Sequence, residues 1–502
     1  MDAELEAKKA ALEADLKDND WSLKWNPDDE LVWMQRGKIF WGVRQYEDAI
    51  AAFSQGITRC TDYGRLYRDR GHCMINSGRH AEAAADYAEA YASLGDDWDT
   101  LYHYGLSCYL IGDYKRAESL YRKAVALADS VGNCLAATNW LWASLQQQGR
   151  KEDAKAVVDA IADSTEVPPD EIGYYRIVFT AKGKMTPEEA LGDGPKKVIQ
   201  DISCAYGISN YYRFVVGDTQ KADALCQKIL DVGKDGMSHP FGYQAAMAEL
   251  AKASFVSLTP ELDEQIAKDP ANEYLWYWKI HAYSKERDLV GAVREASIAM
   301  VNVNDKARFL QGRGHWYTNL GQYEQSACDF TRACLLRPED KNVLYHYGLA
   351  HYLLGEYKRA EKIYKRALDA AASASESIST TNWLWATLVH QKKDAEAQAL
   401  LEATVLEGPI GAPDKTGYDR LLALYKGILP LEDVVPKSDD YSLEDASFLY
   451  GLSNYYYYIE KSQALADQTL DRIMATIPEP LKTCFGYRAT LNERERRQRY
   501  PS

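Results

Sequence analysis

Small and aromatic residues recur along the chain at a spacing of 34 positions. The four recurring columns are Gly37, Gly71 and Gly105; Ala49, Ala83 and Ala117; Phe53, Tyr87 and Tyr121; and Gly56, Ala90 and Ala124. A period of this length is typical of helix hairpins that stack side by side. We expect the small residues to lie where two helix backbones cross, and the rings to fill the gaps between adjacent repeats.

No convincing alternation of apolar and polar residues predicts a strand. Residues 101–127 show the helical pattern best, with a turn at 112–114 between two helical stretches. Stretches rich in proline and glycine interrupt the later helices and predict loops; they lie at 168–169, 192–195, 409–413 and 436. The sequence therefore predicts an all-α superhelical solenoid.

A second, longer period lies on top of the first. Four motifs occur twice, at 102–106 and 345–349, 138–142 and 381–385, 209–212 and 453–456, and 241–243 and 485–487. The offset is 243 for the first two pairs and 244 for the last two, so one residue was inserted between them. An internal duplication therefore predicts two homologous halves in tandem.

These patterns divide the chain into five segments. We expect an N-terminal capping helix, a first half, a linker interrupted by two prolines, a second half and a basic tail, with boundaries at 1–29, 30–253, 254–272, 273–491 and 492–502. Each half is expected to contain about three clear repeats, a degenerate fourth around Trp140 or Trp383, and then diverged helix pairs.

The recurring columns resemble the tetratricopeptide repeat family, whose repeat is 34 residues long. The helices that carry the SNYY motif (209–212) and the FGY motif (241–243) also resemble a group of bacterial tetratricopeptide proteins of unassigned role. The second resemblance implies an architecture and no activity, because a fold does not by itself determine a function.

Charge and hydropathy narrow the classes of partner. The formal net charge of −15 repels polyanions, and the only basic run is 494–499, so we do not expect nucleic-acid binding. No apolar run is long enough to span a membrane. The nine cysteines are scattered singly, which favours reduced thiols and no metal site. We expect a cytoplasmic protein.

The family resemblance implies that the first helix of each repeat lines a concave groove. The residues expected to bind a ligand there are Arg65, Arg68, His72, Tyr102, His103, Tyr109 and Asn139 in the first half, and Arg308, His315, Tyr345, His346 and Asn382 in the second. This mixture suits a polar or anionic group beside a flat one. Alternatively, the tyrosines are packing residues, and the histidines recur in both halves through ancestry.

Members of the family that bind chaperone tails use a clamp of lysine and asparagine residues. At the clamp positions this sequence has Met34 and Lys38, then Asp69, then Asp99 and His103. The clamp is missing, so we do not expect chaperone-tail binding.

Two functions remain open at this point. The first is a scaffold without cofactor that binds a peptide, a protein partner or a small polar molecule in the groove, or that self-associates through its exposed faces. The second is a cofactor-independent isomerase, cyclase or lyase. Its acid–base residues would be Asp69, His72 and His103, since Asp69 and His72 are three residues apart and share a helix face. Arg68 would then hold an oxyanion.

Overall fold

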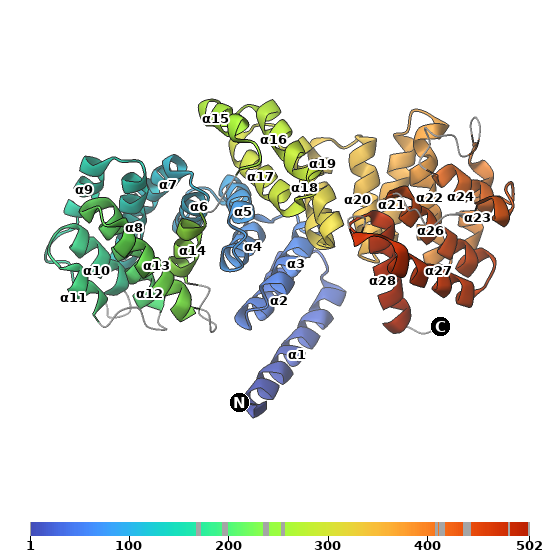
Figure 1. Ribbon diagram of the computed structural model, residues 1–502. Helices are drawn as coiled ribbons and strands as arrows, with labels where there is room; N and C mark the ends of the chain where they lie inside the picture. Colours follow the sequence, from blue (N-terminus) through green and yellow to red (C-terminus); the bar gives the residue numbers. More distant parts are fainter. Residues whose placement is uncertain are drawn as a thin grey trace. The chain divides into compact units, whose positions relative to one another are not determined.

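The computed structural model describes residues 2–166, 172–192, 199–233, 240–252, 257–406, 410, 417–434, 443–479 and 482–499. Every regular element within these ranges is a helix (Figure 1). The prediction of an all-α fold is therefore confirmed.

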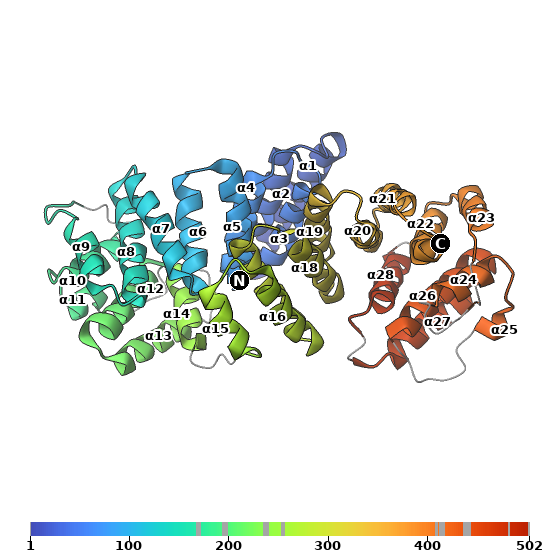
Figure 2. The ribbon, with the colours of Figure 1, turned by 90° about the horizontal axis from the view of Figure 1, so that it is seen from above.

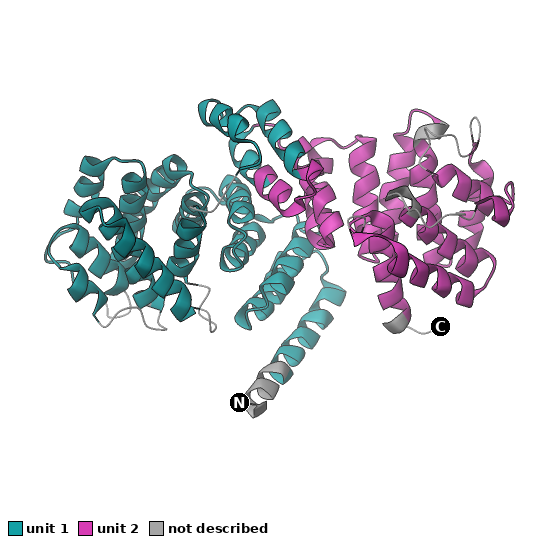
Figure 3. Cartoon of the chain, viewed as in Figure 1, with its two compact units in different colours: residues 1–283, 297–303 teal, residues 284–296, 304–502 magenta. Residues whose placement is uncertain are grey.

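The chain divides into two compact units (Figure 3). Unit 1 contains residues 1–283 and 297–303, and unit 2 contains residues 284–296 and 304–502. The division falls within helices α16 (Glu273–Lys285) and α17 (Leu289–Asn302). The described part of the expected linker belongs to unit 1, and the five-segment division of the sequence stays a prediction.

Helix hairpins build the first part of unit 1. After α1 (Asp2–Trp25) come the pairs α2 (Glu30–Gly42) and α3 (Tyr46–Ile57), α4 (Gly64–Asn76) and α5 (His80–Leu94), α6 (Trp98–Leu110) and α7 (Tyr114–Ala126), and α8 (Val131–Gln147) and α9 (Lys151–Asp159). Successive helices from α2 to α9 contact one another in chain order. This is the arrangement expected of stacked repeats.

The later helices of unit 1 turn back toward the hairpins. They are α10 (Ile172–Ala181), α11 (Pro187–Leu191), α12 (Ile199–Tyr211) with its π-helical extension η2 (Tyr212–Val216), α13 (Thr219–Gly233), α14 (Phe241–Lys252) and α15 (Pro260–Lys268). Helix α14 packs on α12 and α13 and also contacts α4 and α6. The helix that carries the FGY motif of the first half therefore lies against the first helices of the second and third hairpins.

Unit 2 repeats this arrangement (Figures 1 and 2). Its helices are α18 (Ala307–Leu320), α19 (Tyr323–Leu336), α20 (Lys341–Leu353), α21 (Tyr357–Asp369), α22 (Ala374–His390), α23 (Asp394–Ala403), α24 (Tyr418–Tyr425), α25 (Leu431–Val434), α26 (Leu443–Asn454) with η3 (Tyr455–Ile459), α27 (Gln463–Thr476) and α28 (Phe485–Arg499). Helix α28 contacts α18 and α20 as α14 contacts α4 and α6. The basic run expected as a tail lies in α28.

The recurring glycines and rings pack as the 34-residue period predicts. A Cβ atom built on Gly71 would lie 2.9 Å from the Tyr87 ring, and one on Gly105 would lie 2.9 Å from Tyr121. The Tyr87 ring also stacks on His103 of the next repeat, with ring centroids 6.0 Å apart. Each aromatic residue therefore covers the glycine of its own hairpin and fills the gap to its neighbour.

A buried ion pair joins the two helices of one hairpin in each half. Arg70 Nε and Nη2 each donate to a carboxylate oxygen of Asp86 at 2.7 Å. Arg313 makes the same two contacts with Asp329, also at 2.7 Å. All four side chains are almost fully buried. The duplication therefore extends to individual polar contacts that the repeat pattern does not reveal.

Candidate functional site

In each half, the last helix packs against histidines that were predicted to line the groove. In unit 1 the Phe241 ring lies 5.6 Å from His72 and 5.4 Å from His103, centroid to centroid. The two histidine rings are 4.7 Å apart. In unit 2 the corresponding ring of Phe485 contacts His315 and His346 in the same way. The histidines predicted to face a ligand therefore face α14 or α28.

Polar contacts fix these last helices on the repeats. The Gln244 Nε2 group donates to the Asn76 carbonyl at 3.3 Å, and Gln244 Oε1 lies 2.9 Å from Nε2 of His80. In unit 2, Arg488 Nε donates to the Asn319 carbonyl at 2.9 Å. The side chains of Gln244 and Arg488 both donate to a carbonyl near the end of the corresponding repeat helix. Helices α14 and α28 therefore pack at equivalent positions in their units.

Burial keeps the inner histidines neutral. Burial, with the neighbouring His103, lowers the pKa of His72 to about 3. Burial, with the neighbouring His346, likewise lowers the pKa of His315 to about 3. Burial alone would raise the pKa of Asp99, but a hydrogen bond from His103 and the charge of Arg68 lower it to about 2. His72 is therefore an uncharged ring at neutral pH.

The arginines predicted to bind an anion in unit 1 contact carboxylates of the protein. Arg65 donates to both carboxylate oxygens of Glu30, at 3.1 and 2.7 Å. Arg68 Nε lies 3.3 Å from Asp69 and 3.4 Å from Asp99. In unit 2, Arg308 is exposed at the surface. An incoming anion would have to compete with these internal carboxylates for Arg65 and Arg68.

The predicted tyrosines belong to buried networks that recur in both halves. Tyr102 Oη lies 2.9 Å from Tyr174 Oη and accepts a hydrogen bond from Trp140 Nε1 at 3.0 Å. Tyr109 Oη lies 2.8 Å from Tyr206 Oη. Tyr345 is partly buried, and its hydroxyl lies near Tyr418, Tyr364 and Trp383 as that of Tyr102 lies near Tyr174, Tyr121 and Trp140; burial raises the pKa of Tyr345.

The two predicted asparagines lie in the interior. Asn139 and Asn382 are each 4% exposed. Among the described residues, neither side-chain carbonyl oxygen has a hydrogen-bond partner. Helices α10 and α12 pack on α8, and α24 packs on α22, so these amides lie well inside their units. Their role as ligand contacts stays a prediction.

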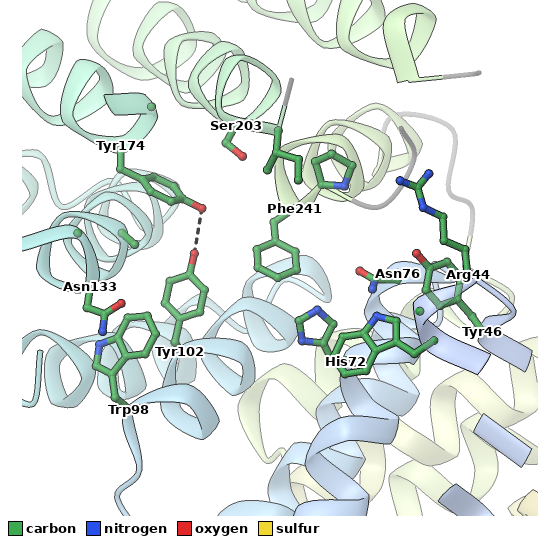
Figure 4. Close-up of a pocket in the computed structure, with 17 residues that line it drawn as sticks. Arg44, Tyr46, His72, Asn76, Trp98, Tyr102, Asn133, Tyr174, Ser203 and Phe241 are labelled. Carbon is green, nitrogen blue, oxygen red and sulfur yellow. Dashed lines mark hydrogen bonds between the residues drawn. The ribbon is translucent and has the colours of Figure 1, made fainter. Parts of the chain in front are cut away.

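A cavity of about 660 Å³ remains beside α14 in unit 1 (Figure 4). It is lined by Trp41, Gly42, Arg44, Tyr46, His72, Asn76, Trp98, Tyr102, Gly132, Asn133, Ala136, Gly173, Tyr174, Ile199, Ser203, Pro240 and Phe241. Aromatic rings dominate this lining, and a few polar groups lie among them. That composition and volume are typical of a binding site.

The lining residues extend along the cavity on both sides of Phe241. Figure 4 shows Arg44 and Tyr46 toward one end, Trp98 and Asn133 toward the other, and Phe241 between them. The Trp98 and Tyr102 rings stack with centroids 4.9 Å apart, so this wall is preformed. The cavity is therefore elongated, with polar groups toward both ends.

Two predicted residues, His72 and Tyr102, line this cavity, and the other predicted residues do not. Trp98, Tyr174 and Phe241 also line the cavity and were not predicted as site residues. Tyr174 and Phe241 both come after the fourth helix pair in sequence, so the 34-residue period gives no reason to place them near His72. A comparison of the two halves could have pointed to the cavity wall, because three of its rings occur in the first half only. The second half has Ser284, Leu289 and Lys341 in place of Trp41, Tyr46 and Trp98.

Comparison with known proteins identifies the repeats. The family described as tetratricopeptide repeat matches residues 34–93, 69–131 and 312–375. These segments coincide with the hairpins α2–α7 and with α18–α21. The chain therefore contains tetratricopeptide repeats in both halves, as its 34-residue period predicts. No curated protein matches the sequence.

Several solved structures resemble the chain at low identity. The crystal structure of the APC/C hetero-tetramer Cut9–Hcn1 is 13% identical, with 97% of this chain and 94% of that chain covered and a TM-score of 0.30. Yeast Tom70 is 13% identical, with 95% and 98% covered and a TM-score of 0.26. Naa15/Naa10 bound to HypK-THB is 14% identical, with 97% and 76% covered and a TM-score of 0.25.

Among the described residues, no helix combines the length and apolar character that crossing a membrane requires.

Proposed function

We propose that the protein is a scaffold that binds a peptide segment of a partner protein in the cavity beside α14. The observation that carries this proposal is the aromatic lining of the 660 Å³ cavity in unit 1. Large rings such as Trp98, Tyr102 and Phe241 can hold an apolar or aromatic side chain, which is the usual anchor of a bound peptide. We place this binding in the cytoplasm, in keeping with nine cysteines that are scattered singly along the chain.

The polar groups of the cavity suit a main chain. The side-chain amides of Asn76 and Asn133 and the hydroxyl of Ser203 can each donate and accept hydrogen bonds. An extended segment offers alternating N–H and C=O groups along its length. The elongated cavity therefore fits a short extended peptide better than a single compact charged group.

The alternative of an acid–base enzyme gains no support from the geometry. A catalytic acid or base works best with a pKa near the working pH, whereas the pKa of His72 is lowered to about 3 by burial and by His103. Asp69 lies 3.4 Å from the ammonium group of Lys38 and 3.3 Å from Nε of Arg68. Its carboxylate is therefore engaged by cations.

The proposal is tested by selecting peptides from a displayed library on the full-length protein and measuring their Kd. Ala136→Phe places a ring in the cavity and should abolish binding. Trp98→Ala removes one wall and should weaken binding by about tenfold or more. Ser379→Phe, at the matching position of the second half, should bind like the wild type.

Each variant is first shown to fold by circular dichroism. Failure to select any peptide, or binding that Ala136→Phe leaves unchanged, would refute the proposal. If Ser379→Phe abolishes peptide binding and Ala136→Phe does not, the peptides bind in unit 2 and the proposal is also refuted.

A further inference from the structure

The cavity in unit 1 is lined by two buried polar side chains that the protein leaves unpaired. Asn76 is 8% exposed and Ser203 is 7% exposed, and both face the cavity (Figure 4). Within the described part of the chain, neither side chain has a hydrogen-bond partner. Because buried polar groups in folded proteins are normally hydrogen-bonded, these two side chains indicate that a ligand supplies the missing partners.

The Asn76 amide lies at a preformed end of this cavity. Figure 4 shows it at the same end as the Tyr46 hydroxyl and the His72 ring. The Tyr46 hydroxyl also has no hydrogen-bond partner among the described residues. The main-chain carbonyl of Asn76 is held by Gln244, and the Trp41 ring lies 4.6 Å from that of His72, centroid to centroid. The backbone and the imidazole at this end are therefore fixed before any ligand binds.

The second half keeps the amide and loses the hydroxyl. Asn319 stands at the position that matches Asn76, and Leu289 stands at the position that matches Tyr46. The Oδ1 atom of Asn319 is buried, and it has no partner among the described residues. The combination of an amide with a neighbouring hydroxyl is therefore a feature of the first half.

The groups at this end each donate and accept hydrogen bonds. A carboxamide, a phenol and a neutral imidazole all do so, and burial with the neighbouring His103 lowers the pKa of His72 to about 3, so its ring is neutral. Among the described lining residues, only Arg44 carries a full charge. An ammonium would be repelled by Arg44, and a carboxylate would leave the acceptor atoms of this end unpaired. A neutral group that both donates and accepts therefore fits best.

The geometry of an amide distinguishes a side chain from a main chain. A trans peptide group points its N–H and its C=O in opposite directions. A primary carboxamide carries an N–H and the C=O on one edge, and Asn76 presents the same kind of edge. The two edges can pair through two hydrogen bonds, which leaves Asn133 and Ser203 for the main chain of the segment.

We propose that the end of the cavity formed by Tyr46, His72 and Asn76 binds the carboxamide side chain of a glutamine or asparagine in the bound segment. This inference rests on the proposed peptide-binding function and adds the kind of residue that the segment must carry. The rings of Trp98 and Tyr102 remain available for the apolar anchor of the same segment.

The test starts from the peptides that a displayed library yields on the full-length protein. We expect glutamine or asparagine to be enriched at one position of these peptides. The probe is the tightest of them, synthesised also with methionine in place of that glutamine (leucine in place of asparagine) and with the corresponding acid. Calorimetric titration should show about tenfold weaker binding of both altered peptides, because each leaves buried groups of the cavity unpaired.

The matching protein variant is Asn76→Leu, which keeps the main-chain contact with Gln244. It should bind the amide peptide about tenfold more weakly and bind the apolar peptide as the wild type does. A purely structural role of Asn76 would instead weaken both peptides equally. Asn319→Leu, at the matching position of the second half, is the control and should bind both peptides like the wild type.

Three outcomes would overturn this inference while leaving the peptide site intact. They are selected peptides without a shared glutamine or asparagine, binding of the acidic peptide as tight as that of the amide, and an Asn76→Leu protein that still discriminates between the amide and apolar peptides. Failure to select any peptide would refute the peptide site and this inference together.

Discussion

At the scale of single residues, the most demanding feature is the burial of full charges inside a hairpin. Arg70 and Arg313 each hold an aspartate with two hydrogen bonds of 2.7 Å, and Arg70 Nη1 also donates to Ser54 Oγ at 2.7 Å. Removing one partner of a buried pair leaves the other charge without compensation. The pair therefore constrains how the two helices can pack.

Arg313→Met should lower the free energy of unfolding by about 3–5 kcal/mol, because Asp329 would lose its buried partner. The double change Arg313→Met/Asp329→Leu should recover most of that loss. Urea denaturation followed by circular dichroism measures both. Arg337→Met, which breaks an exposed pair with Asp305, should cost about 1 kcal/mol or less. Equal losses for Arg313→Met and Arg337→Met would contradict this account.

The sequence was sufficient to predict some of the cavity-lining residues but not the buried charged pairs. His72 and Tyr102 were found because they lie on the first helices of repeats, whose phase follows from the glycine column. Arg70 and Asp86 were not singled out, because a charged residue in an amphipathic helix is usually solvated. Their pairing depends on how two helices meet, which the pattern within one helix does not encode.

At the scale of elements, the hairpins were predictable and the position of the last helix was not. The 34-residue period describes contacts between neighbours in the chain. The contact of α14 with α4 and α6 joins segments that are far apart in sequence. The recurrence of the FGY motif marked α14 and α28 as equivalent, but it carried no indication of what they cover.

The close approach of α14 to α12 depends on Gly242. A Cβ atom there would lie 2.6 Å from the Ile202 carbonyl oxygen and 2.7 Å from the Ser203 Cα. Because both are backbone atoms, Gly242→Ala should cost about 1–3 kcal/mol in the free energy of unfolding. In Gly42→Ala the new methyl group would meet nothing within 4 Å, so this control should be neutral or slightly stabilising. A Gly242→Ala protein as stable as Gly42→Ala would refute this packing role.

At the scale of the whole molecule, the two halves share a framework and differ in the side chains around it. Both retain the docked last helix, the buried ion pair and the paired histidines. Three rings of the unit 1 cavity, at Trp41, Tyr46 and Trp98, are replaced in the second half, whereas the rings of Tyr102, Tyr174 and Phe241 recur there as Tyr345, Tyr418 and Phe485. The framework is therefore common to both halves, while part of the lining of the unit 1 cavity differs between them.

His72 and His315 should make the free energy of unfolding of the protein decrease in acid. The pKa values of His72 and His315 are about 3 in the folded protein, against about 6.5 for an unfolded chain. The unfolded state therefore binds more protons as the pH falls from about 6.5 toward 3, and stability is lost over that range. Between pH 7 and pH 5 the loss should be about 2 kcal/mol for each histidine.

Urea denaturation at pH 7, 6 and 5 measures this loss for the wild type and for His72→Gln/His315→Gln. Because the variant lacks the two buried imidazoles, its stability should fall less steeply over the same pH range. A variant with the slope of the wild type would show that other groups cause the acid sensitivity.

The return of α14 and α28 onto the repeats bears on how a protein of this kind can evolve. An array with a free end can lengthen by one hairpin at a time. Here a hairpin added before the final helices would carry α14 away from α4 and α6, or α28 away from α18 and α20, and would uncover apolar rings. We therefore expect each half to be duplicated only as a complete unit. The internal duplication of this chain, which copied a whole half, agrees with that expectation.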